Sequence, residues 1–106
     1  MEYKNLLLVC ASGITTGLLV RNMKKEVTSQ ELPIHIYAAP SITLNQIIRD
    51  KKIDGVLLGP QIEHEIEDIG RLLNSSKIPF DMIDKDSYEL LDSTAVLNDG
   101  KKLLDL

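Results

Sequence analysis

Short apolar runs alternate with longer amphipathic stretches along the whole chain. Residues 6–9 and 56–58 are continuously apolar, as is typical of strands that are covered on both faces. Residues 34–38 alternate between apolar and polar positions, and residues 79–83 begin with a proline, which is tolerated only near the start of a strand or at a sheet edge. The pattern therefore predicts four strands, with the first and third at the centre of a sheet.

The stretches after these strands have helical periodicity. From about Thr15, apolar side chains recur every four residues, which indicates an amphipathic helix. We expect Pro40-Ser41 to cap a second helix, Pro60 to begin a third, and Ser93 to cap a last one. Residues 84–92 are expected to form a loop before the last helix.

The regular alternation of strands and helices defines the fold class. It predicts an α/β three-layer sandwich with a four-stranded parallel sheet in the order 2-1-3-4 and helices on both faces. Ligands of such sheets bind beyond the carboxyl ends of the strands, where the winding direction reverses. That point lies between the first and third strands, so the loops 10–17 and 59–63 are the candidate site.

Composition narrows the function classes. The 106 residues, 43% of them hydrophobic, are expected to form a single domain over 1–106. Twelve basic against sixteen acidic residues give a net charge of −4, which argues against nucleic-acid binding. The apolar runs are too short for membrane insertion and no signal peptide is evident. One cysteine cannot form an internal disulfide, so the cytoplasm is the expected location.

The loop at residues 10–17 has the ingredients of an anion site. Gly13 permits the backbone angles that turn successive N–H groups inward, and the start of the following helix adds free amides and a favourable dipole. Cys10 faces the same end of the sheet, where the positive helix end favours the nucleophilic thiolate. Hydroxyl donors come from three side chains of the loop: Ser12, Thr15 and Thr16.

Cys10 could instead be a small buried apolar residue, but the glycine and hydroxyl residues beside it favour chemistry. The loop has neither G-x-G-x-x-G nor a Gly-Lys-Ser/Thr sequence. A cysteine phosphatase would need an arginine six positions after its nucleophile; Thr16 is there, and the next arginine is Arg21. The loop thus has a nucleophile without a cationic clamp, which suits a group that carries phosphate and releases it.

Other polar residues carry weaker signals. Gln61, at the start of the third helix, could contact a phosphate or a partner, or could be ordinary polarity at a helix start. His35 and His64 are expected on the solvated surface. No group of His, Cys and carboxylate residues has the spacing of a metal site, so no metal is expected. With four aromatic residues, none in the two loops, nothing would stack on a flavin or form a sugar platform.

Two segments carry a family resemblance: residues 10–16 (CASGITT), which follow an apolar strand, and residues 56–61 (VLLGPQ) at the third strand. They resemble the IIB components of the bacterial phosphoenolpyruvate-dependent sugar phosphotransferase system, in its lactose/cellobiose (chitobiose) class. The resemblance implies one phosphocarrier domain, with a fold like flavodoxins and low-molecular-weight phosphatases. The segment 87–93 departs from the glycine-containing loop that is usual in the family.

The resemblance also implies a reaction. Cys10 would accept a phosphoryl group from a phosphohistidine of the IIA partner and pass it, without a cofactor, to a sugar held by the membrane-embedded IIC permease. A β-linked disaccharide such as cellobiose or chitobiose is preferred because residues 59–61 look closest to that subgroup. Gln61 is a secondary candidate. The expected phosphate-binding residues are Ala11, Ser12, Gly13, Ile14, Thr15, Thr16 and Gly17.

Two alternatives to this sugar phosphotransferase role stay open at this stage. One is a low-molecular-weight cysteine phosphatase, and the other is a noncatalytic module that binds phosphate or flavin.

Overall fold

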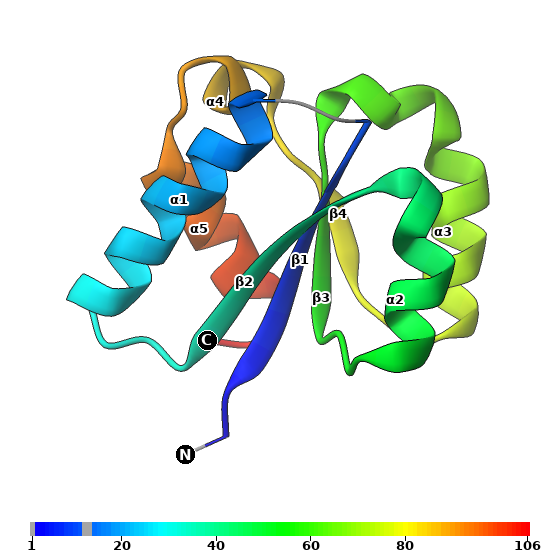
Figure 1. Ribbon diagram of the computed structural model, residues 1–106, viewed down its shortest axis with the longest axis horizontal. Helices are drawn as coiled ribbons and strands as arrows, with labels where there is room; N and C mark the ends of the chain where they lie inside the picture. The colour runs from blue at the N-terminus through cyan, green and yellow to red at the C-terminus, as the bar shows by residue number, and fades with distance from the viewer. Residues whose placement is uncertain (1, 12–13) are drawn as a thin grey trace.

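The computed structural model describes residues 2–11 and 14–106 and contains one four-stranded parallel sheet in the order β2-β1-β3-β4 (Figure 1). This confirms the predicted strand order, with the first and third strands at the centre. The strands are β1 (Lys4–Cys10), β2 (Ile34–Pro40), β3 (Gly55–Leu58) and β4 (Phe80–Met82).

Helices cover both faces of the sheet, which confirms the three-layer α/β architecture (Figure 1). One face carries α1 (Ile14–Ser29), α4 (Lys85–Glu89) and α5 (Ser93–Leu103). The other carries α2 (Leu44–Asp50), α3 (Ile66–Ser75) and two 3-10 segments, η1 (Ser41–Thr43) and η2 (Pro60–Glu65). Among the described helices, none has the length and apolar character needed to cross a membrane.

The continuous apolar run of β1 is explained by burial on both sides. Leu6 and Leu8 belong to a cluster with α1 and α5, whereas Leu7 and Val9 belong to a second cluster with α2 and α3. All four side chains are at most 1% exposed. Each contributes about 1.5–3 kcal/mol of burial free energy, so β1 is the element that joins the two halves of the core.

The segment 84–92, expected as a loop, contains the short helix α4, so that prediction was wrong. The Asp84 carboxylate accepts a hydrogen bond from the backbone N–H of Ser87 at 3.0 Å and thereby caps the helix. Tyr88 in this helix is 5% exposed and packs into the cluster that contains α1 and α5. Burial of this tyrosine supplies the driving force for a helix of only five residues.

The cap of α5 also differs from the prediction by one residue. Asp92, not Ser93, accepts the hydrogen bond from the backbone N–H of Ala95, at 3.1 Å. The hydroxyl of Ser93 instead donates to the carboxylate of Glu26 on α1, which Thr94 also contacts at 2.7 Å. Ser93 thus ties α5 to α1 and does not serve as the cap.

Two helices begin through 3-10 segments. Pro40 ends β2, and η1 separates it from α2, whose start has no side-chain cap; the expectation that Pro40-Ser41 caps this helix was wrong. The Thr43 hydroxyl donates to the Pro40 carbonyl at 2.9 Å and closes the turn between them. Pro60 does begin a helical segment, as predicted, but its first six residues are 3-10 and the α-helical part starts at Ile66.

Two helical glycines allow a matched test of this packing. A Cβ on Gly100 would lie 2.6 Å from Leu6 Cδ2 in the core, whereas a Cβ on Gly17 would meet nothing within 4 Å. We expect Gly100→Ala to lower the free energy of unfolding by about 1–2 kcal/mol, because overpacking outweighs the gain in helix propensity. Gly17→Ala should raise it by about 0.5 kcal/mol. Urea denaturation checks both values, and equal effects of the two substitutions would contradict this account.

Candidate functional site

The carboxyl ends of β1 and β3 meet at one edge of the sheet, the upper edge in Figure 1. The backbone N–H of Gly59 donates to the carbonyl of Val9 at 2.8 Å and extends the strand pairing to the last residues of both strands. The start of α1, η2 and α4 all lie at this edge (Figure 1). The structure therefore brings together the ends of the two loops that the sequence analysis singled out, and adds α4.

Cys10 is the last residue of β1 and lies opposite Pro40 of β2. Its side chain is 6% exposed, and its Sγ is 3.9 Å from the carbonyl oxygen of Ala39. A thiol is a weak donor, and a contact of this length holds it only loosely. Cys10 is thus buried at the end of its strand, at the edge of the sheet.

The first turn of α1 supplies backbone donors next to this cysteine. The helix begins at Ile14, so its first four N–H groups, through Gly17, have no acceptor within the helix. Thr15 is half-buried, Thr16 is buried, and Gly17 is exposed, as is Ala11 before the helix. Of the predicted phosphate-binding residues, Ser12 and Gly13 lie outside the described residues.

Backbone amides supply positive charge next to Cys10. The sequence has no lysine or arginine between residues 5 and 20. The free amides and the dipole of the 16-residue helix α1 therefore favour an anion beside this cysteine. Lys85, the first residue of α4, lies at the same edge and lines a pocket with Gln61 and Tyr88.

A hydrogen-bond network, buried at Thr16 and Tyr88 and exposed at Gln61, links the elements of this edge. The hydroxyl of Tyr88 lies 2.6 Å from the hydroxyl of Thr16 and accepts a hydrogen bond from Nε2 of Gln61. Thr16 and Tyr88 are 2% and 5% exposed. The sequence analysis left both a structural and a functional interpretation of Gln61 open. Its side-chain amide is bonded to Tyr88, which lies at this sheet edge.

Tyr88 is the residue that the sequence analysis missed, because it lies in the segment 84–92 that was expected to be a loop. The helix α4 carries it to the sheet edge. The available signal was Asp84, a favourable N-cap residue three positions before Ser87 and four before an aromatic side chain. That signal predicts a short helix with an inward-facing tyrosine.

Gly59 gives Gln61 the room to take part in this network. A Cβ on Gly59 would lie 2.6 Å from Oε1 of Gln61 and 3.3 Å from the carbonyl oxygen of Val9. The amide of Gln61 therefore lies directly against the bare backbone at Gly59, itself beside Cys10. A glycine is required here for close approach, not for an unusual backbone angle.

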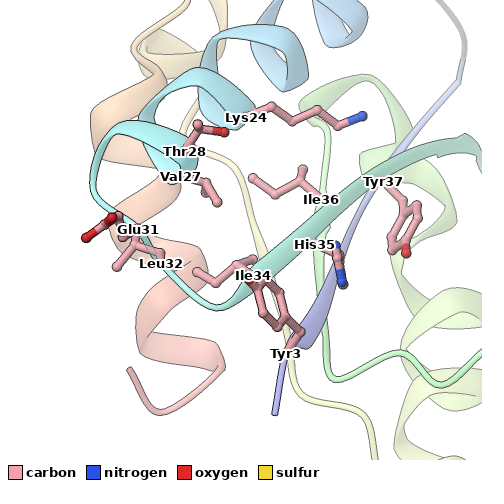
Figure 2. A pocket seen from close by; sticks show the side chains of 10 residues that line it. All are labelled: Tyr3, Lys24, Val27, Thr28, Glu31, Leu32, Ile34, His35, Ile36 and Tyr37. Atoms are coloured by element: carbon pink, nitrogen blue, oxygen red, sulfur yellow. The ribbon is translucent and has the colours of Figure 1, made fainter. Parts of the chain in front are cut away.

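The two histidines make contacts with residues other than Cys10. Both are exposed, as predicted. His35 on β2 stacks on Tyr3 with ring centroids 4.6 Å apart, at the rim of a groove between α1 and β2 that Figure 2 shows. His64 on η2 lies 3.6 Å from the carboxylate of Glu65. Within the described part of the chain, no three His, Cys, Asp or Glu side chains gather as metal ligands.

Comparison with known families gives a consistent result over the full fold. Residues 5–105 match the family model described as "PTS system, Lactose/Cellobiose specific IIB subunit". Two relatives from Lactococcus lactis, the galactose-specific EIIB component of subspecies cremoris and the cellobiose-specific EIIB component of subspecies lactis, are each 26% identical. Both alignments cover 98% of this chain and 99% of the relative.

Two further similarities extend this comparison. The lactose-specific EIICB component of Staphylococcus haemolyticus is 27% identical over 98% of this chain, which corresponds to 17% of that longer protein. The solution structure of a cellobiose-specific phosphotransferase IIB component from Borrelia burgdorferi superposes with a TM-score of 0.82 at 25% identity. It covers 98% of this chain and 94% of the other. Together with the strand order, this places the chain in the flavodoxin-like fold.

The close packing at Gly59 can be tested directly. We expect Gly59→Ala to push the Gln61 amide away from Tyr88, because the side chain yields more easily than the backbone of Val9. Backbone amide shifts in NMR spectra should then change at Thr16 and around Tyr88, with a loss of about 1 kcal/mol in unfolding free energy. Gln61→Ala should reproduce the same pattern of shifts. Unchanged signals at Thr16 and Tyr88 in both variants would contradict the network.

Proposed function

The chain belongs to the family of lactose/cellobiose-specific IIB subunits of the sugar phosphotransferase system, and from this we propose that Cys10 is its phosphoryl carrier. The donor is a phosphohistidine of a IIA partner, and the acceptor is a sugar held by a IIC membrane component. The observation that supports this most is the position of the chain's one cysteine, at the end of β1 next to the free amides of α1.

The first transfer is an in-line displacement at phosphorus. The Cys10 thiol loses its proton to solvent, and the thiolate forms a sulfur–phosphorus bond while the bond from phosphorus to the histidine nitrogen breaks. The nitrogen keeps the electron pair, and because the other ring nitrogen carries a proton, the histidine leaves as neutral imidazole. In the second transfer a sugar hydroxyl attacks the same phosphorus, its proton is released, and the thiolate leaves with the sulfur–phosphorus electron pair.

The loop has to stabilise the phosphoryl group during its transfer to Cys10 and again during its transfer from Cys10 to the sugar. Backbone N–H groups from Ala11 to Gly17 hold the three equatorial oxygens, with the hydroxyls of Ser12, Thr15 and Thr16 as further donors. A phosphatase is disfavoured because Thr16, which stands where its arginine would be, directs its hydroxyl at Tyr88. Without a guanidinium or a nearby general acid, the intermediate is passed on faster than water removes it.

The sugar follows from the relatives and not from this chain's own pockets. We infer a β-linked disaccharide such as cellobiose or chitobiose, supported by the cellobiose-specific relative and the matching structure. A relative that joins IIC and IIB in one protein supports direct transfer from Cys10 to a sugar in the permease.

Exposed apolar side chains around the site support docking of a protein partner. Ile42 is 89% exposed in η1, directly after the strand that pairs with Cys10, and Leu90 is 79% exposed after α4. Leu18, in the second turn of α1, is also exposed. Because Cys10 itself is almost covered, a phosphohistidine reaches it only when its protein packs against this rim.

Phosphorylation of Cys10 is tested by mass. With a phosphorylated IIA protein of this class as donor, the intact chain should gain one phosphoryl group, and Cys10→Ser should gain none under the same conditions. His35→Ala and His64→Ala are the controls and should be labelled like the natural chain. Labelling of Cys10→Ser, or its loss in either histidine variant, would contradict the assignment.

Docking is tested by the dependence of the rate on donor concentration. Ile42→Ser should raise the IIA concentration that gives half-maximal labelling by about fivefold, with the maximal rate nearly unchanged, because it removes contact area and no reacting group. Leu106→Ser, at an exposed site at the chain's other end, is the matched control and should change neither value. A fall in maximal rate alone for Ile42→Ser would place this residue in the chemistry and not in docking.

A further inference from the structure

We propose that Tyr88 is a positioning residue for phosphoryl transfer at Cys10, acting through Thr16 and Gln61. This inference rests on the proposed function and adds a residue from outside both candidate loops. Its basis is the placement of one buried hydroxyl between two side chains that come from different elements of the site.

Packing against the core holds the ring of Tyr88 in place. Its ring belongs to the cluster formed with α1 and α5, and the whole residue is 5% exposed. The hydroxyl therefore has little freedom to move. It meets Thr16 in the first turn of α1 at 2.6 Å and Nε2 of Gln61 in η2 at 2.5 Å. One oxygen atom thus joins three segments that follow β1, β3 and β4.

The number of hydroxyl hydrogens shows how the contact with Tyr88 leaves the hydrogen of Thr16 available for donation. Tyr88 and Thr16 share one hydrogen bond but have two hydroxyl hydrogens, and the Gln61 N–H already uses one lone pair of the tyrosine oxygen. When Tyr88 donates to Thr16, the hydrogen of Thr16 is left for another acceptor. A phosphoryl dianion on Cys10 selects this arrangement, because it adds a charged acceptor to the site.

Gln61 is held by the same oxygen. With Nε2 bonded to Tyr88, its Oε1 lies against Gly59, whose Cβ position would be 3.7 Å from Cys10 Cβ. The network thus fixes the position of Gln61, which follows β3, relative to α1, which follows β1.

Precise placement matters here because the loop that follows Cys10 carries no lysine or arginine. Neutral donors stabilise a developing charge only if they already point at it, and a displacement of about 1 Å can cost up to a hundredfold in rate. Tyr88 supplies that constraint without touching the reacting atoms.

Tyr88→Phe is the direct test, with a phosphorylated IIA protein as the donor. We expect the maximal rate of Cys10 labelling to fall about tenfold, with the half-maximal donor concentration within twofold of the natural chain. Tyr37→Phe removes a hydroxyl from a half-buried tyrosine on β2 and is the matched control; it should leave both values unchanged. The double variant Tyr88→Phe with Gln61→Ala should lose less than the product of the two single losses, because both break one network.

A second measurement separates positioning from folding. Amide shifts of the unphosphorylated Tyr88→Phe chain should change at Thr16 and Gln61 while the β1 and β3 signals stay in place. If this variant does not fold, Gln61→Ala carries the test alone, with the same expected split between maximal rate and donor concentration.

The outcomes are distinct. A natural chain labelled on Cys10 together with a Tyr88→Phe chain of unchanged maximal rate overturns this inference and leaves the proposed function standing. A rise in half-maximal donor concentration with no fall in maximal rate overturns it too, since that marks a docking residue. If the natural chain is never labelled on Cys10, both this inference and the proposed function are wrong.

Discussion

The burial of β1 on both faces is the constraint from which the candidate site follows. Its side chains alternate between the two halves of the core, so the strand cannot slip by one residue without exchanging the partners of every leucine in it. This register places Cys10 as the last residue, level with Pro40 on one side and one residue beyond Val9, which pairs with Leu58, on the other. A reactive group at the end of such a strand inherits the rigidity of the core.

The strand order and the sheet edge that carries the candidate site could be predicted from the sequence, because a continuous apolar run indicates a strand buried on both faces. Residues 6–9 and 56–58 lack polar positions, so they had to be central, and the rules for parallel sheets then placed loops 10–17 and 59–63 at one edge. The helix α4 was not predictable in the same way. It is too short to show a period, and it forms because Tyr88 finds a buried place between elements distant in the chain. Local signals also failed at Ser93, since its hydroxyl is used by Glu26 of another helix.

The same limit explains why the sequence analysis found Thr16 and Gln61 but not their connection. Thr16 was singled out as a hydroxyl donor of the loop 10–17, and Gln61 from its position at the start of a helix. Their common partner comes from the far end of the chain, and only the folded sheet brings its hydroxyl between them. Gly59 is a related case. A glycine is needed at this position because the Gln61 amide lies against its backbone, and that contact exists only in the folded chain.

The burial of Cys10 has a consequence for the proposed phosphoryl transfer. Cys10 is 6% exposed, with Ala39 of β2 and Gly59 after β3 beside it, and the end of β1 leads past the sheet edge. In-line transfer requires the donor and the later acceptor each to approach phosphorus opposite the bond that breaks. In the proposed reaction the sulfur–phosphorus bond would point past the sheet edge, so the histidine of the first partner and the sugar of the second would occupy the same space in turn. Two such partners could not be bound together, and the exposed side chains of Ile42 and Leu90 would then face two different surfaces. Apolar contacts suit such a task, because they are non-directional and do not require each partner to present the same hydrogen-bonding groups.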